Sequence, residues 1–143
     1  MQGPIFVTIA YILVYYALQS RGLRVKSRLK REYKARGEKF DRYFHQDRQL
    51  LAADRKVLNM AEHMPPFLAL LWLNASFVGP LSATIAGSVY VAARILYPFM
   101  MGDTLGTYVP RRILLATVPG YVVLGYLAIS LFVVTLRKTL AGT

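Results

Sequence analysis

The sequence predicts an all-α integral membrane protein, a four-helix bundle that crosses the bilayer four times. Three observations support this prediction. The chain has a formal net charge of +11 but a mean hydropathy of +0.37, two values that soluble basic domains do not combine. The charge is segregated, since residues 21–56 contain 13 of the 18 Lys and Arg residues. The rest of the chain includes four long apolar stretches, which is typical of a membrane domain with one polar arm.

The length and composition exclude several other classes of protein. A chain of 143 residues is long enough for one domain, and a hydrophobic content of 55% excludes a disordered basic tail. The absence of cysteine excludes disulfides, cysteine-ligated metal sites and a protein thiol nucleophile, so any sulfur chemistry requires a thiol from another molecule. The two histidines are not at metal-ligand spacing, and no metal site is expected.

The four predicted spans are residues 4–20, 57–78, 81–101 and 113–136. A bilayer core of about 30 Å needs about 20 apolar residues in a helix, and the first and fourth segments contain no charged residue. Pro4 opens the first segment and Arg21 ends it. No basic residue precedes this segment and no small-x-small cleavage site follows it, so we expect a retained span rather than a cleaved signal peptide.

The second and third spans contain polar residues at membrane depth. Asn59, Glu62 and His63 lie in the first half of the second span, so this half must face something other than lipid. Arg94 is two-thirds of the way along the third span and needs a partner or water for the same reason. Polar residues inside a membrane are costly, and they therefore mark candidate functional positions.

The basic arm at residues 21–56 predicts the orientation of the chain. Positively charged loops stay in the cytoplasm, so we expect a cytoplasmic arm with both termini on the opposite side, N-out and C-out. The membrane would be the plasma or inner membrane of a bacterium or the endoplasmic reticulum of a eukaryote. Because a span flanks each side of the arm, we expect it to bind anionic lipid rather than nucleic acid. Apolar residues at loose helical intervals indicate that part of the arm extends the first helix or lies in the interface.

Three groups of polar residues are predicted to meet in the cytoplasmic leaflet. They are Arg55, Asn59, Glu62 and the adjacent His63 on the second helix, Arg94 and Tyr97 on the third, and Arg111 and Arg112 at the start of the fourth. Two helix N-termini at the same level add backbone N–H donors, so the groups predict a pocket for a small polyanion. The alternatives are an Arg–Glu pair that locks two helices, an interhelical hydrogen bond from Asn59, and arginines that snorkel to the interface.

Three sequence blocks resemble those of the MAPEG family, the membrane-associated proteins in eicosanoid and glutathione metabolism. Residues 55–67, RKVLNMAEHMPPF, have the pattern R-x-x-x-N-x-x-E followed by proline that is found on the second helix of the family. Residues 94–97, RILY, are similar to a block near the end of the third helix. Residues 110–112, PRR, are similar to a Pro-x-Arg motif at the opening of the fourth.

The resemblance implies a homotrimer of four-helix subunits that binds glutathione between neighbours near the cytoplasmic leaflet. By position, Arg55, Asn59 and Glu62 would hold the polar ends of glutathione. The residues that would lie beside them are His63, Arg94 and Tyr97. The substrate would be a hydrophobic small molecule that arrives from the bilayer.

The resemblance also suggests how the thiol would be activated. Arg111 or Arg112 would stabilise the glutathione thiolate, and the Pro-x-Arg spacing favours Arg112. Basic residues just after the first helix join the site in family members, for which Arg21 and Arg24 are the candidates in this chain. An arginine together with a helix N-terminus lowers the pKa of a thiol, so this assignment is chemically sensible.

The sequence departs from the eicosanoid-making members of the family at several positions. Met101 replaces a tyrosine, Val57 replaces a polar residue, and residues 102–110 form a longer loop. We therefore expect a general glutathione transferase or peroxidase for hydrophobic electrophiles, with a role in detoxification, rather than a prostaglandin or leukotriene synthase. The alternative is a non-enzymatic membrane scaffold or accessory subunit of the same fold that acts through the basic arm. A transporter is disfavoured because no inverted repeat is present.

Overall fold

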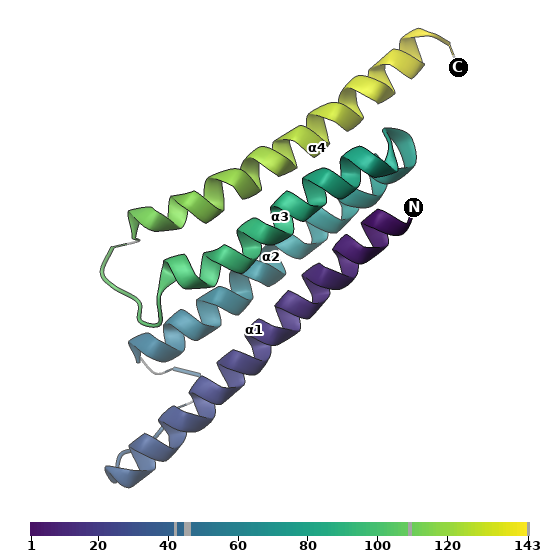
Figure 1. The fold of residues 1–143 in the computed structure, drawn as a ribbon. Helices are drawn as coiled ribbons and strands as arrows, with labels where there is room; N and C mark the ends of the chain where they lie inside the picture. Colours follow the sequence, from purple (N-terminus) through teal and green to yellow (C-terminus); the bar gives the residue numbers. More distant parts are fainter. Residues whose placement is uncertain (42, 45–46, 109, 143) are drawn as a thin grey trace.

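All the regular structure in the described part of the chain is helical (Figure 1). The computed structural model describes residues 1–41, 43–44, 47–108 and 110–142. Its elements, in chain order, are α1 (Gln2–Ala35), α2 (Arg48–Phe77), α3 (Pro80–Met101), the short 3₁₀ helix η1 (Arg111–Ile113) and α4 (Leu114–Leu140). The α-helices lie alongside one another with both termini at the same end of the bundle, which confirms the predicted fold class. The trimer and the N-out, C-out orientation stay predictions.

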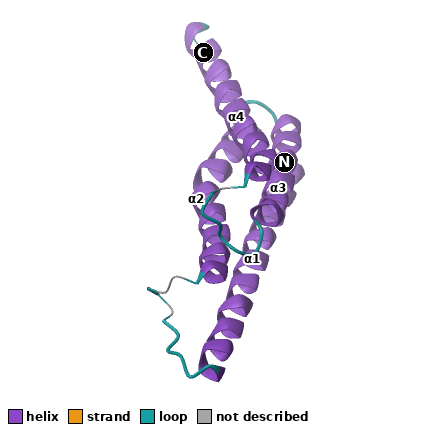
Figure 2. Ribbon diagram, turned by 90° about the vertical axis from the view of Figure 1, so that its left-hand side faces the viewer, coloured by secondary structure: helices purple, strands orange, loops and turns teal. Residues whose placement is uncertain are grey.

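Helix α1 is longer than a membrane span and continues into the basic arm. Its 34 residues give a length of about 51 Å, against about 30 Å for a bilayer core. Its end therefore projects past the other helices (Figure 2). Lys, Arg and Glu favour helix, and Leu29 is buried, so this part has both the propensity and the packing to stay helical. The helix ends before Gly37, whose φ of 73° lies in the left-handed region that favours glycine.

The predicted arm is only partly a connection between helices. Its first part belongs to α1, as one of the two alternatives anticipated, and its last part, from Arg48 on, belongs to α2. Residues 42, 45 and 46 of the arm lie outside the described residues. Helix α2 begins at Arg48 because the Asp47 side chain accepts hydrogen bonds from the backbone N–H groups of Gln49 and Leu50, at 2.8 and 3.2 Å.

Three aromatic side chains join α1, α2 and α3 in the centre of the bundle. Tyr11, Phe67 and Tyr90 are fully buried, and the Phe67 and Tyr90 rings stack with their centroids 4.0 Å apart. The Tyr11 hydroxyl donates a hydrogen bond of 2.7 Å to the Met60 carbonyl. Gly87 permits this close approach, because a Cβ there would lie within 2.8 Å of side chains on α1 and α2. The stack therefore fixes α3 against α2 one turn before Arg94.

Helix α4 is fastened to α2 by a buried amide. Asn74 is fully buried, and its Nδ2 donates a hydrogen bond of 2.7 Å to the Leu127 carbonyl. The Ser130 hydroxyl donates to Asn74 Oδ1, also at 2.7 Å. Interhelical hydrogen bonds of this kind hold helices together in an apolar surrounding. The α4 helix is thus held in a fixed position on the bundle, with its N-terminal part beside α3.

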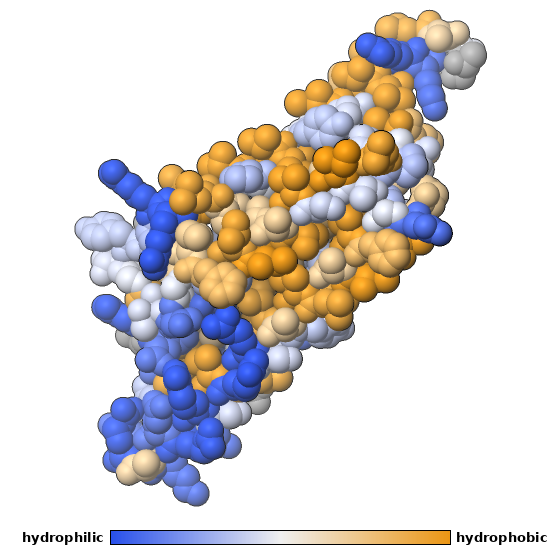
Figure 3. All heavy atoms as spheres, viewed as in Figure 1, coloured by the Kyte–Doolittle hydropathy of each residue, from blue (hydrophilic) through white to orange (hydrophobic). Residues whose placement is uncertain are grey.

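Three helical segments in the described chain are long and apolar enough to span a membrane, namely α1, α3 and the continuous η1–α4 segment. Helix α2 does not meet this criterion because its first half contains charged and polar residues. On the face shown in Figure 3, apolar residues form a broad band across the bundle, and hydrophilic residues gather where α1 projects. The chain is therefore a membrane protein, as predicted, whereas the multi-pass topology and the cytoplasmic position of the arm stay predictions.

Candidate functional site

Arg94 of α3 is the centre of a buried polar cluster against α2. Its side chain is 2% exposed, a costly environment for a cation. Nη1 donates a hydrogen bond of 2.9 Å to Asn59 Oδ1, and Nη2 is 3.4 Å from His63 Nδ1. The guanidinium also lies over the Tyr90 ring, with Cζ 4.8 Å from the ring centroid, a cation–π distance. The structure thus brings together the predicted groups of the second and third helices.

The surroundings of Arg94 have unused hydrogen-bonding capacity. Arg94 Nε and the Tyr90 hydroxyl are buried and have no hydrogen-bond partner among the described residues. No carboxylate in the described part of the chain forms an ion pair with Arg94. Gly120 of α4 leaves room for the guanidinium, since a Cβ there would lie 2.8 Å from Nη2. A buried cation with neutral partners and spare donors fits the polar part of an anionic ligand.

Arg55 and Glu62 form an ion pair on the surface of α2, next to this cluster. Arg55 Nη1 is 3.7 Å from Glu62 Oε1, and the two side chains are 50% and 48% exposed. Tyr97 of α3, in contrast, is buried. The predicted stripe on α2 therefore divides in the structure. Asn59 turns toward Arg94, whereas Arg55 and Glu62 stay open to the outside of a single chain.

Proline releases backbone carbonyls at the same level of the bundle. Pro66 and Pro98 lie inside α2 and α3, four residues after Glu62 and Arg94 respectively. Because proline has no N–H group, the carbonyl oxygens of Glu62 and Arg94 lack their usual helical donor. Each of the two helices therefore has a backbone acceptor at this level that is free of its usual helical hydrogen bond.

Arg111 and Arg112 lie in η1, at the start of the α4 segment, and both are exposed. Arg112 Nε donates a hydrogen bond of 2.8 Å to the Met100 carbonyl, which fastens this side chain to the end of α3. Gly102 makes the turn beneath it with a φ of 81°, and a Cβ there would lie 3.2 Å from Arg112 Nη2. Among the described residues, no hydrogen bond or ion pair joins either arginine to Arg55 or Glu62.

A model of the MAPEG family matches residues 4–133, a range that includes all three sequence blocks described above. The chain belongs to the MAPEG family. This confirms the resemblance seen in the sequence. MAPEG proteins are helical membrane bundles, and the family includes glutathione transferases as well as members that are not enzymes. Members of the family commonly bind glutathione. No curated protein matches the chain.

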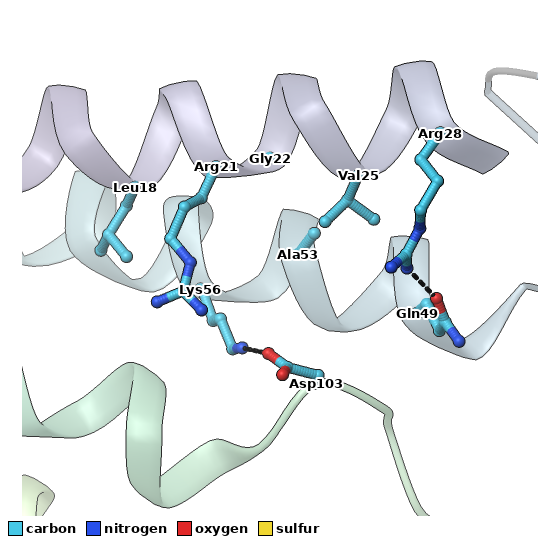
Figure 4. A pocket seen from close by; sticks show the side chains of 9 residues that line it. All are labelled: Leu18, Arg21, Gly22, Val25, Arg28, Gln49, Ala53, Lys56 and Asp103. Atoms are coloured by element: carbon cyan, nitrogen blue, oxygen red, sulfur yellow. Dashed lines mark hydrogen bonds and ion pairs between the residues drawn. The ribbon is translucent and has the colours of Figure 1, made fainter. Parts of the chain in front are cut away.

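The two candidates after the first helix lie outside the Arg94 cluster of this MAPEG chain. Both lie within α1, which continues to Ala35, and Arg24 is exposed on its surface. Arg21 lines a separate cavity between α1 and α2, and its guanidinium lies 5.9 Å from the centroid of the Phe99 ring (Figure 4). Within one chain, the structure therefore groups Arg21 with a different set of polar side chains.

Sequence reasoning missed two members of that second set. Lys56 is buried, and its Nζ is 3.0 Å from Asp103 Oδ1 in the loop after α3. This hydrogen bond from Lys56 holds the pKa of the Asp103 carboxyl below its ordinary value of 3.8. Lys56 directly follows Arg55 and is the last residue of the basic arm, so the sequence alone assigns it only to the charge that sets the orientation. The available signal was its position on α2, about 100° around the helix from the face of Arg55.

Proposed function

We propose that this chain is a membrane-bound glutathione transferase or peroxidase that activates glutathione as a thiolate for reaction with hydrophobic electrophiles. The observation that supports this most is the Arg94 cluster, in which residues from two MAPEG blocks surround a buried cation that has spare hydrogen-bonding capacity. An arginine with a purely structural role would be expected to pair with a carboxylate. Here the side chains that hold Arg94 are neutral, so its positive charge would stabilise a negatively charged group of the ligand beside it.

The residues of the cluster and the surface pair have different tasks in this proposal. Arg55 offers a half-exposed guanidinium to a glutathione carboxylate, and Glu62 offers a carboxylate to the glutathione ammonium. Arg94 holds Asn59 through its Oδ1 atom, which leaves the amide N–H groups of Asn59 for the ligand. Arg94 therefore positions Asn59 and keeps its Nε donor free for the ligand, and Arg55, Asn59 and Glu62 are the other binding residues.

Thiolate stabilisation is the task of Arg112. Its Nε atom donates a hydrogen bond to the Met100 carbonyl at the end of α3. This bond holds the guanidinium in place and leaves the two Nη groups to donate to sulfur. A thiol with a pKa of about 8.5 is mostly protonated at neutral pH, and a nearby guanidinium and helix N-terminus favour the anion. The thiolate sulfur then bonds to an electrophilic carbon and displaces its leaving group, such as a halide, or it attacks a hydroperoxide oxygen and releases the alcohol, after which a second glutathione gives glutathione disulfide and water. Arg111, one residue earlier, is the second candidate for this role.

We place the complete site between copies of the chain in a homotrimer, at the cytoplasmic leaflet. Arg55, Glu62 and Arg112 are exposed in one chain, and within its described residues no hydrogen bond or ion pair joins Arg112 to the Arg55–Glu62 pair. A neighbouring copy would cover them and exclude water, which strengthens electrostatic interactions. The apolar band in Figure 3 would admit hydrophobic substrates from the bilayer, and the basic arm would contact anionic lipid.

The test is the ultraviolet absorbance of the thiolate when glutathione is added to purified protein. We expect a signal in the wild type, its loss in Arg112→Ala, and a weaker signal in Arg55→Ala and Glu62→Ala. Arg137→Ala, at the other end of α4, is the matched control and should keep the full signal. The proposal is wrong if the wild type gives no thiolate signal at millimolar glutathione. Turnover with a hydroperoxide and with an aryl halide then separates the two reactions.

The exposed basic surface of α1 supports one competing function, a non-enzymatic scaffold. Arg28, Lys30, Arg31 and Lys34 are all exposed on the C-terminal half of this helix. If the chain acts through this surface, neutralising these four residues abolishes the cellular role and Arg55→Ala leaves it intact. The opposite pattern, loss with Arg55→Ala alone, supports the enzyme.

A further inference from the structure

A polar cavity of about 300 Å³ lies between α1, α2 and the loop after α3, apart from the Arg94 cluster (Figure 4). Its polar lining consists of Arg21, Arg28, Gln49, Lys56 and Asp103. Its apolar lining includes Leu18, Val25 and Ala53. The cations come from two helices and the carboxylate from a loop, and all converge on one hollow. A hollow of this size is large enough for a phosphate group with its first substituent.

The two partners of the central ion pair differ greatly in exposure. The Lys56 side chain is 10% exposed, whereas that of Asp103 is 85% exposed. Lys56 lies on a packed helix with its side chain buried, whereas Asp103 lies on a loop with its carboxylate already open to solvent. The Asp103 carboxylate is therefore a counterion that another anion can replace, whereas the Lys56 ammonium stays in the cavity lining. A buried lysine whose only ion-pair partner in the described chain can leave is suited to exchanging anions.

The cavity has an excess of positive charge. Arg21, Arg28 and Lys56 contribute three positive charges, and Asp103 contributes one negative charge. Arg28 donates a hydrogen bond to Gln49 and lies 3.5 Å from Glu32, a half-exposed residue outside the cavity lining. Arg21 forms no ion pair with any carboxylate in the described part of the chain. Because Arg28 already has Glu32 as an ion-pair partner, displacement of Asp103 leaves Arg21 and Lys56 with two unbalanced positive charges, which a dianion would balance.

The positions of these residues place the cavity at the depth of lipid headgroups. Arg21 directly follows the first apolar stretch, Lys56 directly precedes the second span, and Asp103 is the second residue after the helix of the third. A residue at the boundary of an apolar stretch lies where the hydrocarbon core gives way to headgroups and water. The cavity therefore faces the zone in which phosphate groups are most concentrated.

We propose that this cavity binds a phosphate monoester, whose oxygens replace the Asp103 carboxylate on Lys56 and bind Arg21 and Arg28. A phosphate monoester carries a charge of about −1.5 to −2 at pH 7, whereas a phosphodiester carries one negative charge. Arginine forks and a lysine point charge are the usual partners of phosphate oxygens. The monoester has two possible sources, a phosphatidate headgroup in the bilayer or a soluble phosphate ester. Arg21 is also a candidate for the glutathione site, whereas Lys56, Arg28 and Asp103 have no role in the proposed glutathione reaction.

The experiment measures binding of radiolabelled phosphatidate to the full-length protein in phosphatidylcholine micelles, with phosphatidylglycerol as the phosphodiester comparison. We expect phosphatidate to bind at least about tenfold more tightly than phosphatidylglycerol, because only the monoester balances both excess charges. Lys56→Met should weaken phosphatidate binding by about tenfold or more, because it removes the fixed ammonium. Lys30→Met is the matched control on the exposed surface of α1 and should bind as the wild type does.

Asp103→Asn gives a test in the opposite direction. It removes the competing carboxylate, so phosphatidate should bind several-fold more tightly than to the wild type. If Lys56→Met does not fold, the affinity of Asp103→Asn for phosphatidate tests the proposal instead. The proposal is overturned if phosphatidylglycerol binds as well as phosphatidate, if a folded Lys56→Met binds as the wild type does, or if Asp103→Asn binds no more tightly. Competition by glycerol 3-phosphate supports the site with a soluble ester as ligand, and phosphatidate binding without such competition supports it with the lipid.

Discussion

Two buried cations of the bundle, Arg94 and Lys56, have different kinds of partner. Arg94 is held by Asn59, His63 and the ring of Tyr90, which all belong to helices. Lys56 is held by one carboxylate, Asp103, in the loop after α3. The first cation therefore has neutral partners in rigid positions, and the second has a charged partner that can move.

This difference indicates how each cation is used. Side chains on packed helices cannot separate without repacking the bundle, so Arg94 has a fixed geometry that suits the orientation of a ligand-binding amide. An exposed carboxylate can leave its partner at a cost of less than about 1 kcal/mol, so Lys56 suits the exchange of one anion for another. Substitutions at the two places should consequently have effects of different size and kind.

The largest expected effect comes from Arg94→Met. This change leaves Asn59 and His63 without their donor in a closed site, and should lower the free energy of unfolding by about 2–3 kcal/mol. It should also abolish glutathione thiolate formation, because the Asn59 amide is no longer oriented. Arg94→Lys keeps the charge without the guanidinium fork and should restore only part of the signal. A full thiolate signal in Arg94→Met would show that Arg94 does not position the site.

A second, smaller effect is expected from Gly120→Ala, which leaves Arg94 in place but crowds it. The new Cβ would lie 2.8 Å from Arg94 Nη2, and overpacking of this kind costs about 1–3 kcal/mol. The midpoint temperature of thermal unfolding and the thiolate absorbance with glutathione should both be lower than in the wild type. Gly125→Ala on the same helix is the matched control, since its Cβ would have no neighbour within 4 Å. That change should be neutral or stabilise by up to about 1 kcal/mol, and equal losses in the two variants would contradict the prediction.

The smallest effect concerns the pH dependence of the Lys56–Asp103 pair. The hydrogen bond from Lys56 lowers the pKa of Asp103 in the folded state, so the pair stabilises the fold above the unfolded value of 3.8. This contribution is lost as the pH falls through the lowered pKa, and at this exposed site it amounts to less than about 1 kcal/mol. We expect the difference in unfolding free energy between the wild type and Asp103→Asn to shrink between pH 7 and pH 3. A constant difference over this range would show that the pair does not stabilise the fold.

Much of the fold could be predicted from local features of the sequence. Apolar stretches of the length of a span gave the helical class, and Gly79 with Pro80 marked the turn between α2 and α3. The extent of α1 was harder, because the charged residues after Arg21 favour helix but also favour solvent. The burial of Leu29 against the bundle shows why the helical form prevails, and such a contact depends on neighbours far away in the sequence.

The candidate site was predicted in part. The spacing of Arg55, Asn59 and Glu62 placed all three on one side of α2, but could not show that only Asn59 turns toward Arg94. A difference of one or two positions rotates a side chain by 100° or 200° around a helix. Which part of that circle faces a neighbouring helix depends on packing, here on the aromatic stack and the close approach at Gly87.

The sequence by itself determined the membrane class, the helical architecture and the set of polar residues that are costly enough to have a function. These properties follow from composition and from spacing within single helices, both of which are local. Only the tertiary structure decided that Arg94 meets Asn59 and His63, and that Lys56 meets Asp103, 47 positions away. Such pairs depend on how each helix is rotated and shifted against the next. That arrangement is set by the packing of the whole bundle.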